Sequence, residues 1–352
     1  MLAETPAADR LSPCRVLILH NQPILPDDHP DADSEHEVLF TTEFVRRTLT
    51  AAGCEVGTLG VGRDPAVLID GLREFRPDVV FNLFEGLADV GDTEAQAAGI
   101  LEWMEIPYTG CPHQTLCLAR GKHLTKHLLA GAGMPTAKFI VVEETPVECR
   151  LGWPVIVKPA KQDASVGVDQ GSVVTNQQRL NERIALLLDN YGPPVLVEEF
   201  IDGREFSVGV VEAPDLRVLP VSEILFTDKG ADFWPIVTYD AKWKPGSRDY
   251  EATPPKYPAR GVSPRLRGKL ETLARQTFRL LGCRDYARVD FRVRGGKPYI
   301  LEVNPNPDFS PEAGLAGGLQ SAGISHTRFT VNLVQCALAR GGKVLPALRC
   351  DT

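Results

Sequence analysis

The stretch YARVDFRVRGGKPYILEVNPNPD, residues 286–308, carries the strongest signal in this chain. Two runs of alternating side chains flank Gly295 and Gly296, a pattern that predicts a β-hairpin. If its loop comprises residues 295–297, Asp290 lies opposite Glu302, and Arg288 lies opposite Asn304. Because side chains of a strand alternate between faces, all four then point the same way.

The four polar side chains of this hairpin suggest a metal site. Two carboxylates on adjacent strands, here Asp290 and Glu302, repel unless a cation lies between them. Oxygen-only ligands of this kind suit Mg²⁺, which binds through a few protein carboxylates and the oxygens of a nucleotide. The alternative is a solvated face with incidental charges. Neighbouring isoleucine and leucine residues favour a buried sheet and therefore the metal site.

A second stretch, WPVIVKP at residues 153–159, is an apolar strand that ends in Lys158. A buried ammonium is costly unless something negative meets it. One explanation is that Lys158 extends to the surface from the strand end. The other is that it meets a phosphate, since the following loop, KQDASVG at 161–167, has small side chains and free N–H groups. VEEFIDGRE at 197–205 adds backbone groups for an adenine and Glu205 for a ribose, although the chain has no Walker loop.

The order of the expected elements predicts three segments. Residues 1–117 alternate between strand-like and helix-like sequence, which is typical of a parallel sheet with helices on its faces. Residues 118–201 form a smaller α+β unit, and residues 202–352 a second one that contains the hairpin and a long loop from Thr227 to Pro255. The predicted fold class is therefore α/β combined with α+β.

The amino-acid composition argues against some classes of function. The 352 residues carry a net charge of −8. This argues against a nucleic-acid binder, because the protein has no net positive charge to attract the phosphate backbone. Eight cysteines lie without CxxC pairs and indicate free thiols of a reducing compartment. The first residues hold no apolar signal core, and no run approaches membrane length. We expect a cytoplasmic protein without membrane partners.

Taken together, VIVKPA, SVGV, LVEEFIDGREFSV, ARVDF and LEVNPNP resemble the ATP-grasp fold, and most closely its D-alanine–D-alanine ligase family. The resemblance extends from SEHEV at residues 34–38 to the C-terminal helix. It implies an N-terminal parallel α/β domain and two lobes that clasp ATP. In that family ATP phosphorylates the carboxylate of one amino acid, and the amine of a second attacks the acyl phosphate to give a dipeptide.

The resemblance also implies roles for individual residues, carried over by position. The residues expected to bind ATP are Lys122, Lys158 and Ser165 near the phosphates, and Glu198, Phe200, Ile201 and Glu205 near the adenine and ribose. The residues expected to act on the amino acids and the γ-phosphate are Arg288 at the oxyanion, Lys242 at the γ-phosphate and Glu35 at the first ammonium. The expected ligands of two Mg²⁺ ions, with Mn²⁺ as an alternative, are Asp290, Glu302 and Asn304.

The amino-acid half of the site departs from the family. A loop serine and a tyrosine that are linked to the ammonium-binding glutamate are here Ala164 and Trp243, so we expect that hydrogen-bonded closure to be lost. Glu85 replaces a histidine, and Asp308 and Ala313 replace a glycine and a serine near the second substrate. These changes predict weak D-alanyl-D-alanine synthesis and better turnover with another second nucleophile.

The leading hypothesis is an ATP-dependent carboxylate–amine ligase that forms a dipeptide from amino-acid substrates. D-Alanyl-D-alanine for peptidoglycan is the default product. Two alternatives stay open: a ligase of the same mechanism with other amino acids, and a non-catalytic nucleotide-binding regulatory protein. The family resemblance also implies a homodimer through the first domain.

Overall fold

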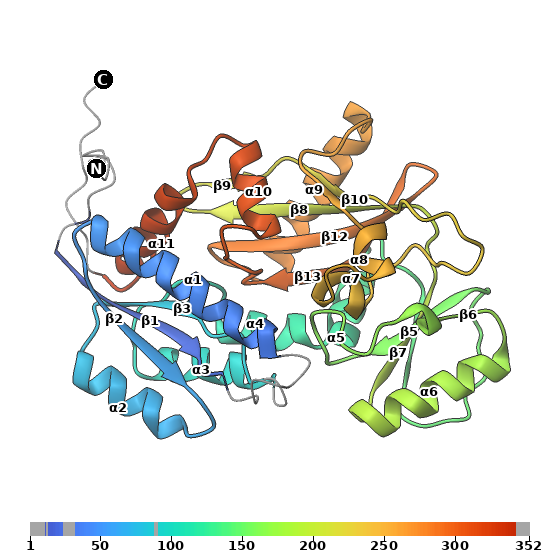
Figure 1. The fold of residues 1–352 in the computed structure, drawn as a ribbon, viewed down its shortest axis with the longest axis horizontal. Coiled ribbons are helices and arrows are strands. Elements are labelled where there is room, and N and C mark those ends of the chain that lie inside the picture. The colour runs from blue at the N-terminus through green and yellow to red at the C-terminus, as the bar shows by residue number, and fades with distance from the viewer. Residues whose placement is uncertain (1–10, 12, 24–31, 88–90, 343–352) are drawn as a thin grey trace.

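The computed structural model describes residues 11, 13–23, 32–87 and 91–342. Its strands form three sheets, of three, four and six strands, and helices cover them (Figure 1). Within the described residues, no helix has both the length and the apolar character needed to cross a membrane.

The first sheet is parallel, as the alternating sequence predicted. Its strand order is β2-β1-β3, and the strands are β1 (Arg15–Asn21), β2 (Glu55–Val61) and β3 (Val79–Leu83). The helices around it are α1 (Ala32–Ala51), α2 (Pro65–Phe75), α3 (Thr93–Trp103) and α4 (His113–Arg120). Asp64 caps α2 by accepting a hydrogen bond from the Ala66 N–H, and Pro65 fits the first turn. The parallel strands bring Asn21 and Glu85 to the same edge of the sheet.

The second sheet has the order β4-β7-β5-β6 and is antiparallel. Its strands are β4 (Phe139–Val142), β5 (Val155–Pro159), β6 (Val173–Val174) and β7 (Val195–Glu199), and its helices are α5 (Lys122–Gly131) and α6 (Gln177–Tyr191), with a short 3-10 turn η2 (Gln170–Ser172). Asn176 caps α6, and Gly192 ends it with a positive φ of 70°. Alternate residues of β5 pack on α6 in a core of their own, which makes this lobe a separate layer.

The third sheet follows the path β11-β10-β8-β12-β13, with β9 on β8. Its strands are β8 (Arg204–Glu212), β9 (Leu216–Val218), β10 (Ser222–Ile224), β11 (Pro255–Lys256), β12 (Tyr286–Arg294) and β13 (Lys297–Pro305). The helices of this segment are α7 (Tyr239–Trp243), α8 (Arg248–Ala252), α9 (Pro264–Leu280), α10 (Gly314–Ser321) and α11 (His326–Arg340). Helices α7 and α8 lie between this sheet and the second one (Figure 1).

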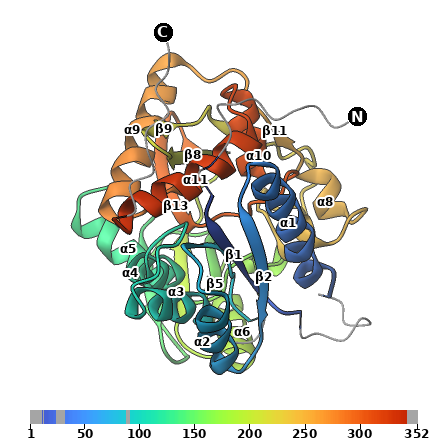
Figure 2. The ribbon, with the colours of Figure 1, turned by 90° about the vertical axis from the view of Figure 1, so that its left-hand side faces the viewer.

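The last helix returns to the first domain. Phe329 and Val334 of α11 share one buried core with Val16 and Ile18 of β1, and α1 and α11 lie on the same side of the molecule (Figure 2). Each sheet falls within one of the three predicted segments. The segment boundaries at 117/118 and 201/202 stay a prediction.

The hairpin has the predicted pairing, but the turn differs from the expected one. Arg294 pairs with Lys297, so the turn is the two residues Gly295 and Gly296, both with positive φ. A two-residue turn alone would place Asp290 opposite Leu301. A β-bulge after Asp290 shifts the register by one residue and restores its pairing with Glu302.

Candidate active site

A cavity of about 1660 Å³ lies where the three sheets meet, and side chains from all of them line it. It brings together every predicted site residue whose side chain the structure describes: Lys122, Lys158, Ser165, Glu198, Phe200, Ile201, Glu205, Lys242, Arg288, Asp290, Glu302 and Asn304. Glu35 belongs to α1, but its side chain lies outside the described part of the chain. Its predicted role therefore stays a prediction.

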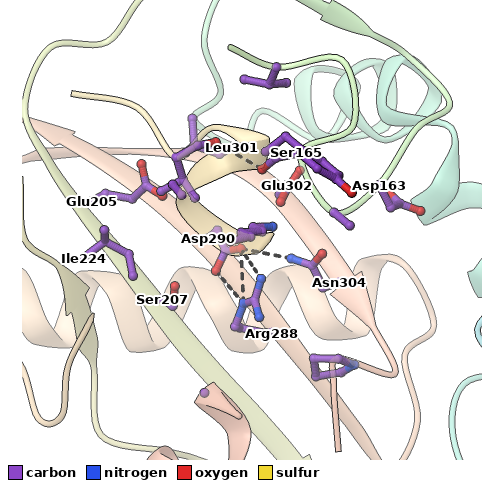
Figure 3. A pocket seen from close by; sticks show the side chains of 18 of the residues that line it. Asp163, Ser165, Glu205, Ser207, Ile224, Arg288, Asp290, Leu301, Glu302 and Asn304 are labelled. Atoms are coloured by element: carbon purple, nitrogen blue, oxygen red, sulfur yellow. Dashed lines mark hydrogen bonds and ion pairs between the residues drawn. The ribbon is translucent and has the colours of Figure 1, made fainter. Parts of the chain in front are cut away.

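The hairpin supplies one wall of the cavity, centred on Asp290. The Arg288 guanidinium donates to both oxygens of Asp290, at 2.9 Å to Oδ1 from Nε and 2.9 Å to Oδ2 from Nη2. Asn304 Nδ2 donates to Asp290 Oδ2 at 3.0 Å (Figure 3). Asp290 is only 7% exposed, so these charge-assisted bonds hold its carboxylate in one orientation.

Glu302, on the neighbouring strand, belongs to a chain of ion pairs. Lys122 Nζ lies 3.1 Å from Glu302 Oε2 and 2.8 Å from Asp163 Oδ1. Arg120 reaches the other oxygen of Asp163 at 3.3 Å. The Lys122 ammonium lowers the pKa of Glu302 well below its usual range, in spite of burial. Burial would lower the pKa of Lys122, but Asp163 and Glu302 raise it, so both groups stay charged.

Lys158 meets a carboxylate rather than the surface. Its Nζ lies 2.5 Å from Glu198 Oε2, and Lys126 contacts the other oxygen of Glu198. Burial alone would raise the pKa of Glu198, but the two ammoniums lower it to about 2. Lys126 also donates to Thr136 Oγ1 at 2.8 Å and to the Ile300 carbonyl at 3.2 Å, so it ties α5 to the hairpin.

The sequence prediction missed Lys126, Arg120 and Asp163. One signal for Lys126 was available: it follows Lys122 by four residues in α5, and residues at that spacing share a helix face. Arg120 ends α4, a helix that the sequence interpretation did not predict. Asp163 lies in a loop, and its cations are distant in sequence.

The predicted nucleotide wall is apolar and contains a buried charge pair. Phe200 and Ile201 are buried, and the Trp234 ring packs edge-on against Phe200 with centroids 5.5 Å apart. Glu205 Oε2 lies 3.0 Å from Arg292 Nε. Burial raises the pKa of Glu205, and Arg292 opposes that shift.

Two loops from different lobes are joined at the cavity by hydrogen bonds other than the family's serine–tyrosine link, whose loss stays a prediction. The Trp243 indole Nε1 donates to the Ala164 carbonyl at 3.2 Å. The Ser165 hydroxyl donates to the Val237 carbonyl at 3.1 Å. Lys242, adjacent to Trp243, lines the cavity. Main-chain carbonyls thus accept the bonds that link these loops.

Asp308, one of the replaced residues at the amino-acid end, lines the cavity. Its carboxylate accepts bonds from the Ser310 N–H at 2.8 Å and the Ser310 hydroxyl at 3.1 Å, and its role toward a second substrate stays a prediction. Ala313 precedes α10 and provides no side-chain cap. Glu85 lines the cavity as expected.

The sequence relatives decide the family. Residues 128–335 match the family model described as D-ala D-ala ligase C-terminus. The D-alanine--D-alanine ligase of Desulforudis audaxviator is 33% identical over 87% of this chain and 96% of its own length. The chain belongs to the D-alanine–D-alanine ligase family. An uncharacterized protein, y4sG of Sinorhizobium fredii, is 32% identical over 74% of this chain and 75% of its own length.

The fold agrees with that of this ligase family. The crystal structure of the D-alanine--D-alanine ligase from Bacillus anthracis complexed with ATP superposes with a TM-score of 0.73, covering 94% of this chain and 99% of that one at 19% identity. The predicted ATP-grasp architecture, a parallel α/β domain with two further lobes, is therefore confirmed. As a member of the D-alanine–D-alanine ligase family, the protein is an ADP-forming ligase that makes a dipeptide.

Proposed function

We propose that this protein joins two molecules of D-alanine, using ATP and an acyl-phosphate intermediate. The observation that carries the proposal is the meeting, in one cavity, of the cations of two lobes with the carboxylate–amide hairpin of β12 and β13. That arrangement lies in a chain whose relatives include D-alanine--D-alanine ligases over nearly their full length.

ATP would lie between the second and third sheets. Lys122 and Lys158 would contact the phosphates, and each is held by a carboxylate. Lys242 approaches from α7 and would meet the γ-phosphate. Phe200 and Ile201 offer an apolar surface to the adenine. Glu205 lines the same wall, where it would accept from the ribose hydroxyls, and Glu198 would act at the adenine by holding Lys158 in place.

The hairpin fits Mg²⁺. Its donor set is two carboxylates and an amide, all oxygen ligands, and Glu302 is held ionised by Lys122. Asn304 donates its Nδ2 to Asp290, which leaves its carbonyl oxygen for a cation. Asp290, Glu302 and Asn304 would hold the metal, which neutralises phosphate charge when it is bound.

These positions support a reaction in two steps. The carboxylate of the first D-alanine attacks the γ-phosphorus, the bond to the β-phosphate oxygen breaks, and ADP leaves. The amine of the second D-alanine, after giving its proton to solvent, attacks the carbonyl carbon of the acyl phosphate, and the C–O bond to phosphate breaks as the peptide bond forms. Arg288 would donate to the oxyanion of the tetrahedral intermediate, an interaction typically worth about 3–4 kcal/mol of barrier.

The alternatives have lost support. The expectation of another second nucleophile rested on replaced residues such as Asp308 and Ala313, and the relatives named D-alanine--D-alanine ligase do not favour it. The family membership favours a working ligase over a non-catalytic nucleotide-binding protein. We place the reaction in the cytoplasm, where ATP is supplied, and the homodimer stays a prediction.

A coupled assay tests the proposed substrates. Purified protein is mixed with ATP, Mg²⁺ and each of a panel of D- and L-amino acids, singly and in pairs, and ADP and dipeptide are both quantified. We expect D-alanine alone to support stoichiometric formation of ADP and D-alanyl-D-alanine. Dipeptide formation only with another amino acid would overturn the D-alanine assignment while keeping the ligase mechanism. ADP formation independent of every amino acid would overturn both.

A further inference from the structure

We propose that Cys14 and Cys54 are a site of reversible oxidation, at which a hydroperoxide forms a disulfide that stabilises the first domain. We call these two residues the thiol pair. Both carry free thiols in the structure. Neither lines the cavity of the candidate active site, so the inference is independent of the ligase reaction.

The two sulfurs of the thiol pair are in contact. Cys14 Sγ lies 3.2 Å from Cys54 Sγ, although the residues are 40 positions apart in sequence. A disulfide bond is about 2.0 Å long, so the sulfurs need to approach by only about 1 Å to form one. A small change in the side-chain torsions supplies a shift of that size.

The backbone holds the thiol pair at the spacing that a disulfide requires. Each cysteine directly precedes its strand, and the parallel register of β1 and β2 begins with Arg15 opposite Glu55 (Figure 2). The Glu55 N–H donates to the Cys14 carbonyl at 3.0 Å, which extends the pairing to the two cysteines. Neighbouring strands lie about 4.8 Å apart. That spacing falls within the range of about 4.4–6.8 Å between the Cα atoms of a disulfide.

The surroundings of the thiol pair select a small oxidant. Cys14 is 6% exposed and Cys54 is 7% exposed, and both belong to a core that includes Leu11 and Leu49. A bulky disulfide does not fit into such a site, whereas hydrogen peroxide is little larger than water. The Cys54 thiol donates to the Cys14 sulfur and lowers the pKa of Cys14, in spite of burial and of Asp78. This favours the thiolate, which is the nucleophilic form of cysteine.

The oxidation takes place in two balanced steps. The Cys14 thiolate attacks one oxygen of hydrogen peroxide, the O–O bond breaks, and the departing hydroxide takes a proton from solvent, which leaves a sulfenic acid on Cys14. The Cys54 sulfur then attacks the Cys14 sulfur, and its proton leaves with the hydroxide as water. Two thiols are thus oxidised and one peroxide is reduced to two waters. Because Cys54 is in contact with Cys14, the disulfide forms before a second peroxide oxidises the sulfenic acid further.

The disulfide would close a loop that contains α1, since Ala32–Ala51 lies between the two cysteines in sequence. Such a crosslink lowers the conformational entropy of the unfolded chain and so stabilises the folded one. The thiol pair lies at the start of β1, whereas Asn21, at the other end of this strand, lines the cavity. We therefore expect oxidation to stabilise the first domain and to leave the cavity unchanged.

The test compares the wild-type protein with Cys54→Ser and with Cys117→Ser as the matched control. Serine at 54 keeps the size of the side chain and removes the partner of Cys14. Cys117 is exposed on α4, outside the thiol pair. Each protein is treated with a graded series of hydrogen peroxide, and the remaining thiols are alkylated. Peptide mass spectrometry and thermal melting without substrates are then measured before and after dithiothreitol.

We expect the wild-type protein and Cys117→Ser to yield a linked peptide that contains Cys14 and Cys54 and has lost two hydrogens. Their melting temperature should rise by ~5 °C, and dithiothreitol should reverse both changes. Cys54→Ser should show no such rise, and its Cys14 should gain oxygen instead. In the wild-type protein, oxygen gained by the exposed Cys117 shows that the peroxide dose was sufficient.

A thiol pair that stays reduced at doses where Cys117 gains oxygen would overturn the proposal. A linked peptide without a rise in melting temperature, or an equal rise in Cys54→Ser, would overturn the stabilising role. If Cys54→Ser fails to fold, Cys14→Ala provides the same comparison. None of these measurements needs catalytic turnover, so a protein that makes no dipeptide would contradict the proposed function and leave this test intact.

Discussion

Replacing Glu198 with glutamine should destabilise the protein more than removing either lysine that contacts it. Glu198 is 2% exposed and Lys126 is 1% exposed, whereas Lys158 is 13% exposed. One carboxylate here balances two ammoniums, so Glu198→Gln leaves both lysines facing a neutral amide of the same size. Breaking a buried pair by removing one partner typically costs about 3–5 kcal/mol.

The lysine variants should behave differently, because Glu198 keeps one partner in each of them. In Lys158→Met the contact with Lys126 stays, so we expect a stability loss of less than about 2 kcal/mol, below the range for a broken buried pair. The same variant should lose at least ~10-fold in ATP affinity, since one phosphate cation is missing. In Lys126→Met the contact with Lys158 stays, but the bonds to Thr136 and Ile300 are lost.

Two measurements separate these effects. Urea denaturation of the ligand-free variants gives stability, and calorimetric titration with a non-hydrolysable ATP analogue gives affinity. We expect Glu198→Gln to be the least stable of the three and Lys158→Met to retain most of its stability while losing affinity. Wild-type stability in Glu198→Gln would refute the balanced-charge argument. Unchanged affinity in Lys158→Met together with a large stability loss would show that Lys158 is only structural.

Three further predictions concern the metal site and acid stability. Asp290→Asn or Glu302→Gln should abolish ADP formation without changing the melting temperature by more than a few degrees, and near-normal turnover in either would contradict the Mg²⁺ assignment. Burial lowers the pKa of His326 to about 4. The His326 ring packs against the rings of Phe44 and Phe309, with centroids 4.7 Å away in each case. Because the unfolded histidine takes up a proton near pH 6.5 and the folded one does not, stability should fall as the pH drops from 6.5 toward 4. His326→Phe should reduce the slope of melting temperature against pH between pH 6.5 and 4. An unchanged slope would contradict the assignment. The pKa of Glu198, lowered to about 2, predicts a separate stability loss between pH 4.5 and about 2, which Glu198→Gln should remove.

The sequence by itself determined the elements and the chemistry that they carry. Alternation in residues 286–305 predicted both strands of the hairpin and the shared face of Asp290 and Glu302. The strand that carries Lys158 near its end and the parallel first sheet were likewise predictable. These are local patterns: the period of a strand and the polar residues at its end depend on neighbours in sequence.

Only the tertiary structure decided how that chemistry is arranged. The bulge after Asp290 sets the pairing that a two-residue turn would have shifted by one position. The partners of Lys158, Asp163 and Trp243 come from residues on other elements, and no local pattern specifies them. Their energies depend on burial and on distances of about 3 Å between groups remote in sequence, which packing of the three sheets alone can set.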